Sequence, residues 1–110
     1  MPTERRWEME RLIMRENFPQ MEPFVTKDRF GFQGWLRMKS DYQIVVEGTE
    51  RYPFVEPRVY ISPKPEEHHW YRNDGEPYLC SHRDNGWSPA RSTFASCVAI
   101  AIKYINSFGG

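Results

Sequence analysis

The stretch YPFVEPRVYI, residues 52–61, decides how the middle of the chain is interpreted. Its second half has the β-rich composition of a strand, but prolines stand at positions 53 and 57. Proline has no N–H group and a restricted φ, so it occurs at the start of a strand or on a sheet edge and not inside a ladder. The two prolines therefore predict a fixed approach to a strand that covers residues 58–63.

Upstream of this strand, three more runs have the residue composition of β-strands. Residues 24–27, 30–38 and 42–49 are short β-rich runs separated by polar or glycine-containing turns. Because the connections are too short for crossover helices, neighbouring strands should run antiparallel. The sequence thus predicts an antiparallel meander of three or four strands.

Two segments with helical spacing flank the meander. Residues 4–18 follow Thr3 as an N-cap and stop before Pro19, and their apolar residues are Trp7, Leu12, Met14 and Phe18. Residues 92–108 carry apolar side chains three and four apart, so this helix should pack against the sheet. The order of helix, meander, long irregular segment and helix predicts an α+β domain with its helices on one side of the sheet.

Composition predicts one ordinary globular domain. The 110 residues include 15 Lys and Arg against 15 Asp and Glu, and a zero net charge without a basic run argues against a nucleic-acid or anionic-membrane partner. No run approaches the roughly 20 apolar residues of a membrane span, and the N-terminus does not resemble a signal peptide. We expect a cytoplasmic protein without a cofactor, in which Cys80 and Cys97 remain thiols.

Between Ser62 and Ala90 the chain has no sustained period, and it contains four prolines and all three histidines. Irregular segments of this length are uncommon inside compact domains and are usually functional. The chemistry of the protein is therefore expected in this long loop.

Three motifs in this order resemble the ubiquitin-conjugating enzymes: YPFVEPRV at 52–59, DGEPYLC at 74–80, and WSPA at 87–90. In that family the first motif precedes the last strand of the meander, an Asn/Asp-Gly turn leads to the active cysteine, and Trp-Ser-Pro-Ala opens the following helix. The resemblance covers roughly residues 42–108. It implies the ubiquitin-conjugating fold for a single catalytic domain, residues 1–110, with a long active-site loop.

The departures from the family's pattern are similar to its minimal bacterial branch. Eukaryotic members carry His-Pro-Asn ahead of the cysteine, where this chain has His68-His69-Trp70. Some bacterial members are encoded beside antiviral signalling enzymes, so the resemblance implies ubiquitin-like conjugation with a link to antiviral defence. The two extra C-terminal helices common in the family are not expected here.

The resemblance implies that Cys80 accepts the C-terminal glycine of a ubiquitin-like protein as a thioester from an activating enzyme and passes it to an amine. Thioester exchange between thiols is nearly thermoneutral, whereas attack by an amine gives a more stable amide. His69, Asn73 or backbone N–H groups are the candidate donors to the developing oxyanion. The ordinary alternative for Cys80 is a buried small side chain, but its polar neighbours at 81–84 favour an active thiol. Cys97 lies on the apolar face of the last helix and is expected in the core.

The resemblance also implies surfaces for partners. Phe54, Pro89 and Ala90 match the exposed patch that docks a ligase, although transfer directly to a protein target is also open. Exposed aromatic residues flanked by prolines suit such a patch, but Phe54 could equally lie in the core. The basic face of the first helix, which docks the activating enzyme in the family, is matched by Arg5, Arg6 and Arg11.

The main alternative from another class is a catalytically silent binding module of the same fold. Some ubiquitin-conjugating-enzyme variants have lost the cysteine and only bind partners. A cysteine retained after Leu79 favours the enzyme, whereas the missing His-Pro-Asn favours the module.

Two weaker alternatives concern single features. A zinc site could use His68, His69, Cys80 and His82, although structural zinc usually shows paired ligands such as C-x-x-C. The terminal Gly109-Gly110 resembles the conjugated end of a modifier, although glycines that follow a helix are more commonly a C-cap.

Overall fold

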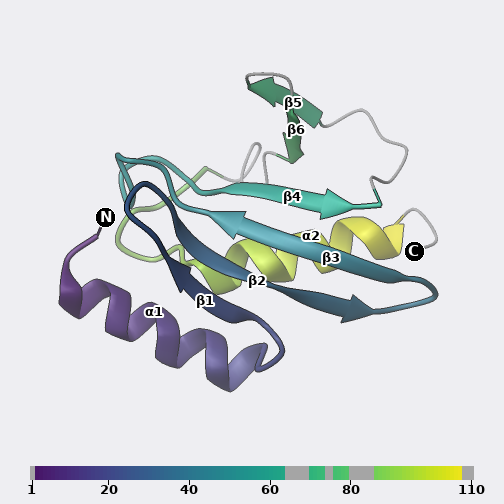
Figure 1. The fold of residues 1–110 in the computed structure, drawn as a ribbon, viewed down its shortest axis with the longest axis horizontal. Helices are drawn as coiled ribbons and strands as arrows, with labels where there is room; N and C mark the ends of the chain where they lie inside the picture. The colour runs from purple at the N-terminus through teal and green to yellow at the C-terminus, as the bar shows by residue number, and fades with distance from the viewer. Residues whose placement is uncertain (1, 64–69, 74–75, 80–85, 108–110) are drawn as a thin grey trace.

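The computed structural model describes residues 2–63, 70–73, 76–79 and 86–107, with 70–73 and 76–79 described by their backbone. Along the chain the elements are α1 (Glu4–Asn17), β1 (Glu22–Val25), β2 (Phe30–Arg37), β3 (Asp41–Glu47), β4 (Arg58–Ser62), β5 (Trp70–Asn73), β6 (Glu76–Leu79) and α2 (Phe94–Ser107) (Figure 1). The predicted α+β class, with an N-terminal helix, a four-stranded antiparallel meander and a C-terminal helix, is confirmed.

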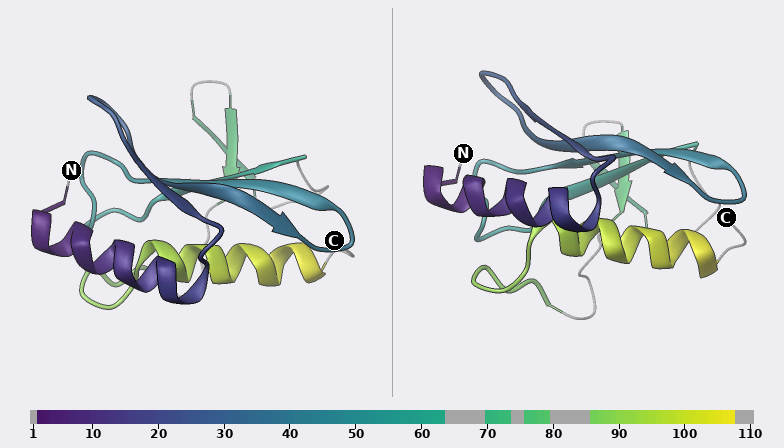
Figure 2. Two further views of the ribbon diagram at one scale, coloured as in Figure 1. Left: turned by 60° about the horizontal axis from the view of Figure 1, so that its bottom comes forward. Right: turned by 90° about the horizontal axis from the view of Figure 1, so that it is seen from below.

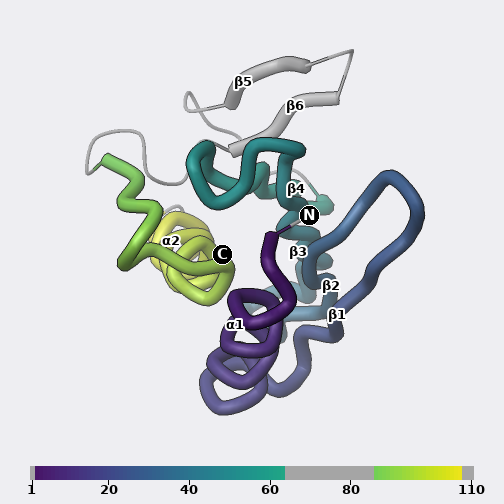
Figure 3. Tube along the Cα trace, turned by 90° about the vertical axis from the view of Figure 1, so that its left-hand side faces the viewer, coloured from purple at the N-terminus to yellow at the C-terminus, as the bar shows by residue number. Residues whose placement is uncertain are grey.

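Both helices lie on the same face of the sheet, as predicted (Figure 2). The end-on view in Figure 3 shows α1 and α2 side by side against that face, where the two helices contact each other. None of the helices in the described part of the chain is long and apolar enough to cross a bilayer.

The sheet has the strand order β1-β2-β3-β4-β6-β5, and every neighbouring pair is antiparallel. Val46 of β3 pairs with Phe32 of β2 on one side and with Val59 of β4 on the other. All three side chains are buried, so the register directs one apolar row toward the helices.

The prediction of a wholly irregular segment from 62 to 90 is wrong, because β5 and β6 form a hairpin within it. Asn73 at the end of β5 pairs with Glu76 at the start of β6, and the two strands run antiparallel. Each strand is only four residues long and β6 contains Pro77, so neither strand produces a detectable period.

The buried face of α1 differs from the predicted one at Leu12, Glu10 and Phe18, the last of which is half-buried just after the end of the helix. Thr3 caps the helix as predicted, since its hydroxyl accepts a hydrogen bond from the Arg6 amide. The buried residues are Trp7, Glu10 and Met14, at spacings of three and four. Leu12, predicted on the apolar face, is 47% exposed because its position points away from that stripe.

Aromatic side chains fill the space between the sheet and the helices. Tyr52 and Phe94 stack with their ring centroids 4.6 Å apart, and Trp7 of α1 lies 5.1 Å from the ring of Phe32. Cys97 of α2 is fully buried in the same core, as predicted. Tyr52, the first residue of the YPFVEPRVYI stretch, is therefore a core residue.

Candidate functional site

Of the predicted catalytic residues, the structure describes only the backbone of one. Cys80 and His69 lie outside the described residues, and Asn73 is described only through its backbone, as the last residue of β5. Leu79, which precedes Cys80, ends β6 and pairs with Val59 of β4. The residue before Cys80 therefore lies beside β4, the strand formed by the second half of YPFVEPRVYI.

Two loops far apart in the sequence are joined beside this strand. We call residues 48–57 and 86–93 the paired loops. The indole Nε1 of Trp87 donates a hydrogen bond to the carbonyl oxygen of Pro53, and the Trp87 ring lies 5.8 Å from that of Tyr52. The Tyr-Pro-Phe and Trp-Ser-Pro-Ala motifs thus meet in space.

The three residues predicted for a partner patch lie on the paired loops. Phe54 is 75% exposed, which settles the choice between core and surface in favour of the surface. Ala90 is also exposed and Pro89 is half-buried. Phe54 is thus available for contact with a partner, although a single exposed apolar side chain is common on protein surfaces.

Arg6, predicted as a partner contact, is instead bound internally. Its guanidinium donates through Nη1 to the carbonyl oxygen of Pro89 at 2.7 Å, and through Nη2 to the carbonyl oxygen of Ser92 at 2.7 Å and to the Tyr52 hydroxyl at 3.1 Å. Its Nε donates to Glu10 at 2.8 Å. Four of the five N–H donors of Arg6 are therefore used within the protein.

Glu10 is a buried charged residue of this region that the sequence analysis did not single out. It is 1% exposed, and its carboxylate accepts hydrogen bonds from Arg6 Nε, from the Tyr52 hydroxyl and from the backbone amide of Phe94 at 3.0 Å. Phe94 is the first residue of α2, so Glu10 satisfies an otherwise unpaired amide at the positive end of that helix. The available signal was the Arg6/Glu10 spacing of four residues, but such pairs are common on exposed helices.

The net effect of burial and hydrogen bonds is to raise the pKa values of Tyr52 and Arg6. Burial raises the pKa of the Tyr52 hydroxyl above its usual range, and the hydrogen bond to the Glu10 carboxylate raises it further. Burial lowers the pKa of Arg6, but its hydrogen bonds to Glu10 and Tyr52 outweigh that effect and the net shift is upward. Tyr52 therefore stays a neutral donor and Arg6 a cation at any ordinary pH.

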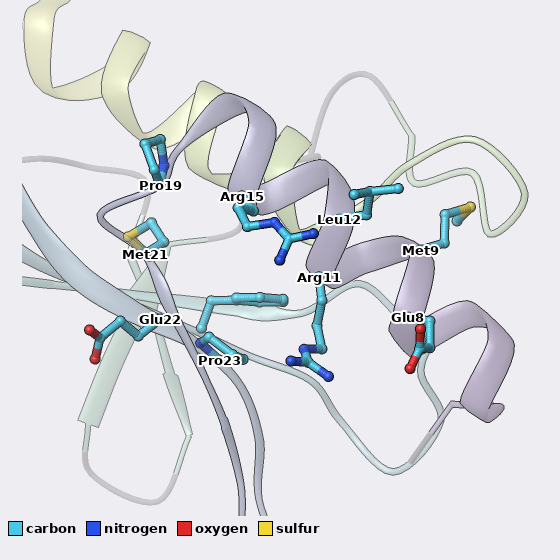
Figure 4. Close-up of a pocket in the computed structure, with 10 residues that line it drawn as sticks. Glu8, Met9, Arg11, Leu12, Arg15, Pro19, Met21, Glu22 and Pro23 are labelled. Carbon is cyan, nitrogen blue, oxygen red and sulfur yellow. The ribbon is translucent and has the colours of Figure 1, made fainter.

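The other two predicted arginines of α1 are exposed. Arg5 lies in the first turn, and Arg11 lines a groove of about 630 Å³ between α1 and β1. Figure 4 shows Arg11 and Arg15 on the side of α1 that faces Glu22 and Pro23 of β1. Among the described residues, neither Arg11 nor Arg15 lies within ion-pair distance of a carboxylate, so both charges face solvent.

The zinc alternative and the terminal glycines fall outside the described side chains. His68, His69, Cys80 and His82 are not among the described residues, and neither are Gly109 and Gly110. Among the side chains that the structure describes, no group of three or more His, Cys, Asp or Glu is arranged to hold a metal ion.

Comparisons with known proteins return nothing for this chain. No family model matches it, and neither the curated proteins nor the solved structures contain a match.

Proposed function

We propose that the protein is a ubiquitin-conjugating-like carrier enzyme with Cys80 as its nucleophile. The observation that carries the proposal is the hydrogen bond from Trp87 to Pro53, because it joins two of the three motifs on which the resemblance depends. The third motif supports the same assignment, since β6 ends at Leu79 beside β4. Motifs that were separate in the sequence thus border one region of the molecule.

In the proposed reaction the Cys80 thiolate attacks the carbonyl carbon of a thioester held by an activating enzyme. A new carbon–sulfur bond forms at Cys80, and the activating enzyme's sulfur leaves as a thiolate. An amine of the target then attacks the same carbon, a carbon–nitrogen bond forms, Cys80 leaves as a thiolate, and the amine loses a proton. His69, Asn73 and backbone N–H groups near Cys80 are the proposed donors to the oxyanion.

The proposed partners follow from the exposed residues. Phe54, with Pro89 and Ala90, is the proposed contact for a ligase or for the target itself. Arg5 and Arg11, whose side chains are exposed on α1, are the proposed contacts for the activating enzyme. A cytoplasmic location, where a thiol stays reduced, belongs to the same proposal, as does a role in bacterial antiviral defence.

A second candidate function is a silent binding module that uses the same docking surface. The sequence His68-His69-Trp70, which stands where the family has His-Pro-Asn, favours this candidate. Such a module would keep the exposed Phe54 but would carry no thioester.

A charging assay separates the two functions. The chain is incubated with ATP and with the activating enzyme and ubiquitin-like protein encoded in the same genome, and the products are analysed on a non-reducing gel. The carrier function predicts an adduct that thiol reductant removes, that Cys80→Ser abolishes or converts to a reductant-stable ester, and that Cys97→Ala leaves unchanged. Cys97 is the matched control because its thiol is fully buried in the core.

The same assay can reject the enzyme. If the activating enzyme itself becomes charged and the modifier binds the chain, but no adduct forms on Cys80, the protein is a binding module. Stoichiometric zinc in the purified protein would instead favour a metal-binding adaptor.

A further inference from the structure

A cluster of three polar side chains, the buried Glu10 and Tyr52 and the half-buried Arg6, joins α1 to both of the paired loops. Tyr52 belongs to the first loop, and Arg6 donates to carbonyl oxygens of Pro89 and Ser92 in the second. We infer that Arg6 and Glu10 are positioning residues for the paired loops, so that the surface which presents Phe54 is set from α1. The identity of the docking partner rests on the proposed function, whereas the positioning itself does not.

The contacts of Arg6 select one path for the second loop. The guanidinium is planar and its N–H groups point in fixed directions, so its two bonds to carbonyl oxygens at positions 89 and 92 hold both peptide groups at once. Within that loop, the amide of Ser92 also bonds to the carbonyl oxygen of Ser88 at 2.7 Å. A lysine ammonium has no planar fork and cannot hold the two carbonyls in the same way.

Glu10 fixes the guanidinium itself. One carboxylate oxygen accepts from Arg6 Nε and from the Tyr52 hydroxyl, while the other accepts from the Phe94 amide at 3.0 Å. Because Phe94 begins α2, the carboxylate is held between both helices and cannot rotate without losing a hydrogen bond. The orientation of Arg6 therefore depends on how α1 sits against α2.

The same cluster controls the first loop through Tyr52. The Tyr52 ring is 3% exposed and packs against Phe94, so its hydroxyl and ring are both fixed. The next residue, Pro53, accepts the hydrogen bond from Trp87 of the second loop. Phe54 follows directly, and its amide bonds to the carbonyl oxygen of Arg51 at 2.7 Å. The cluster and the Trp87 bond together close a ring of contacts that passes through α1 and both loops.

Amide hydrogen exchange on the full chain tests the inference. The variants are Arg6→Lys, which keeps the charge and loses the fork, and Arg5→Lys, the exposed neighbour on the same turn. The reporters are the hydrogen-bonded amides of Phe54 and Ser92 and the indole N–H of Trp87, compared with amides of β2 and β3. We expect exchange of the loop reporters to become about tenfold faster in Arg6→Lys, with β2 and β3 and all of Arg5→Lys unchanged.

Two results would overturn the inference. Unchanged loop exchange in Arg6→Lys means that Arg6 does not hold the loops, and an equal acceleration in β2 and β3 means that the cluster only supports global stability. If Arg6→Lys does not fold, Tyr52→Phe, which removes only the hydroxyl, replaces it with the same expected pattern. Faster loop exchange in a chain that forms no Cys80 adduct would support the positioning role and reject the carrier function, so the two failures are distinguishable.

Discussion

Replacing Glu10 with alanine should cost the fold about 4 kcal/mol. The substitution removes three hydrogen bonds at once, from Arg6, Tyr52 and the Phe94 amide, in a site that is 1% exposed. Removing one partner of a buried ion pair typically costs about 3–5 kcal/mol, because the other charge is left without compensation. Arg6 keeps its bonds to Pro89, Ser92 and Tyr52, so the middle of that range applies.

The expected loss is large for a domain of this size. Domains of this kind have a free energy of unfolding of about 5–15 kcal/mol. With an unfolding entropy of roughly 2.1 cal/mol/K per residue over 110 residues, a loss of about 4 kcal/mol lowers Tm by about 15–20 °C. Glu8→Ala is the matched control, since Glu8 is exposed on the same helix, and it should change stability by less than about 0.5 kcal/mol.

Urea and thermal unfolding, followed by far-ultraviolet circular dichroism, measure both variants. Glu10→Gln should lie between them, because the amide oxygen can still accept a hydrogen bond but the charge opposite Arg6 is gone. A Glu10→Ala variant within about 1 kcal/mol of Glu8→Ala would refute the reasoning, since the carboxylate would then contribute no more than an exposed residue.

Three further predictions concern single positions. In the unfolded chain the Tyr52 side chain starts to ionise near pH 10.0, whereas in the folded state it keeps its proton above that pH. The free energy of unfolding should therefore fall by about 1.4 kcal/mol per pH unit above that pH. Urea titrations of Tyr52→Phe should lack this slope. Trp87→Phe should cost about 1 kcal/mol in urea unfolding through loss of the hydrogen bond to Pro53, whereas Trp35→Phe, at a side chain that is 57% exposed, should cost less than about 0.5 kcal/mol. Gly31→Ala should lower the urea midpoint by an amount equivalent to about 3 kcal/mol or more, because a Cβ there would lie 2.0 Å from a backbone carbonyl oxygen of β3.

The elements that the sequence predicts well are those with a long internal period. In α2, apolar residues at spacings of three and four, from Phe94 to Ile105, mark the buried face. The strands of the meander are bounded by polar or glycine-containing turns, so the first and last residues of each strand could be predicted to within about two residues. The β5–β6 hairpin could not, because four-residue strands, one of them interrupted by Pro77, contain too few positions to show alternation.

In the candidate site, the two loops could be identified from the sequence, whereas the buried polar contacts could not. The motifs singled out two loops that the structure brings together, and Phe54 and Ala90 on them are exposed. The internal contacts of Arg6 and Glu10 could not be predicted because their partners are remote in the sequence. The carbonyl oxygens of Pro89 and Ser92 lie 83 and 86 residues along the chain from Arg6. A glutamate on a buried helix stripe looks like an ordinary charged residue until the backbone amide of the opposite helix is known.

Polar side chains are needed at this position because they bind backbone groups of the paired loops and of α2. A buried ion pair can often be replaced by well-packed apolar side chains of similar volume with no loss of stability. Apolar side chains, however, could not bind the carbonyl oxygens of Pro89 and Ser92 or the amide of Phe94, and buried backbone groups left without partners are costly. The polar cluster therefore permits two irregular loops to pass over the end of the core while their backbone groups stay satisfied. Phe54, on the first of these loops, remains exposed to solvent.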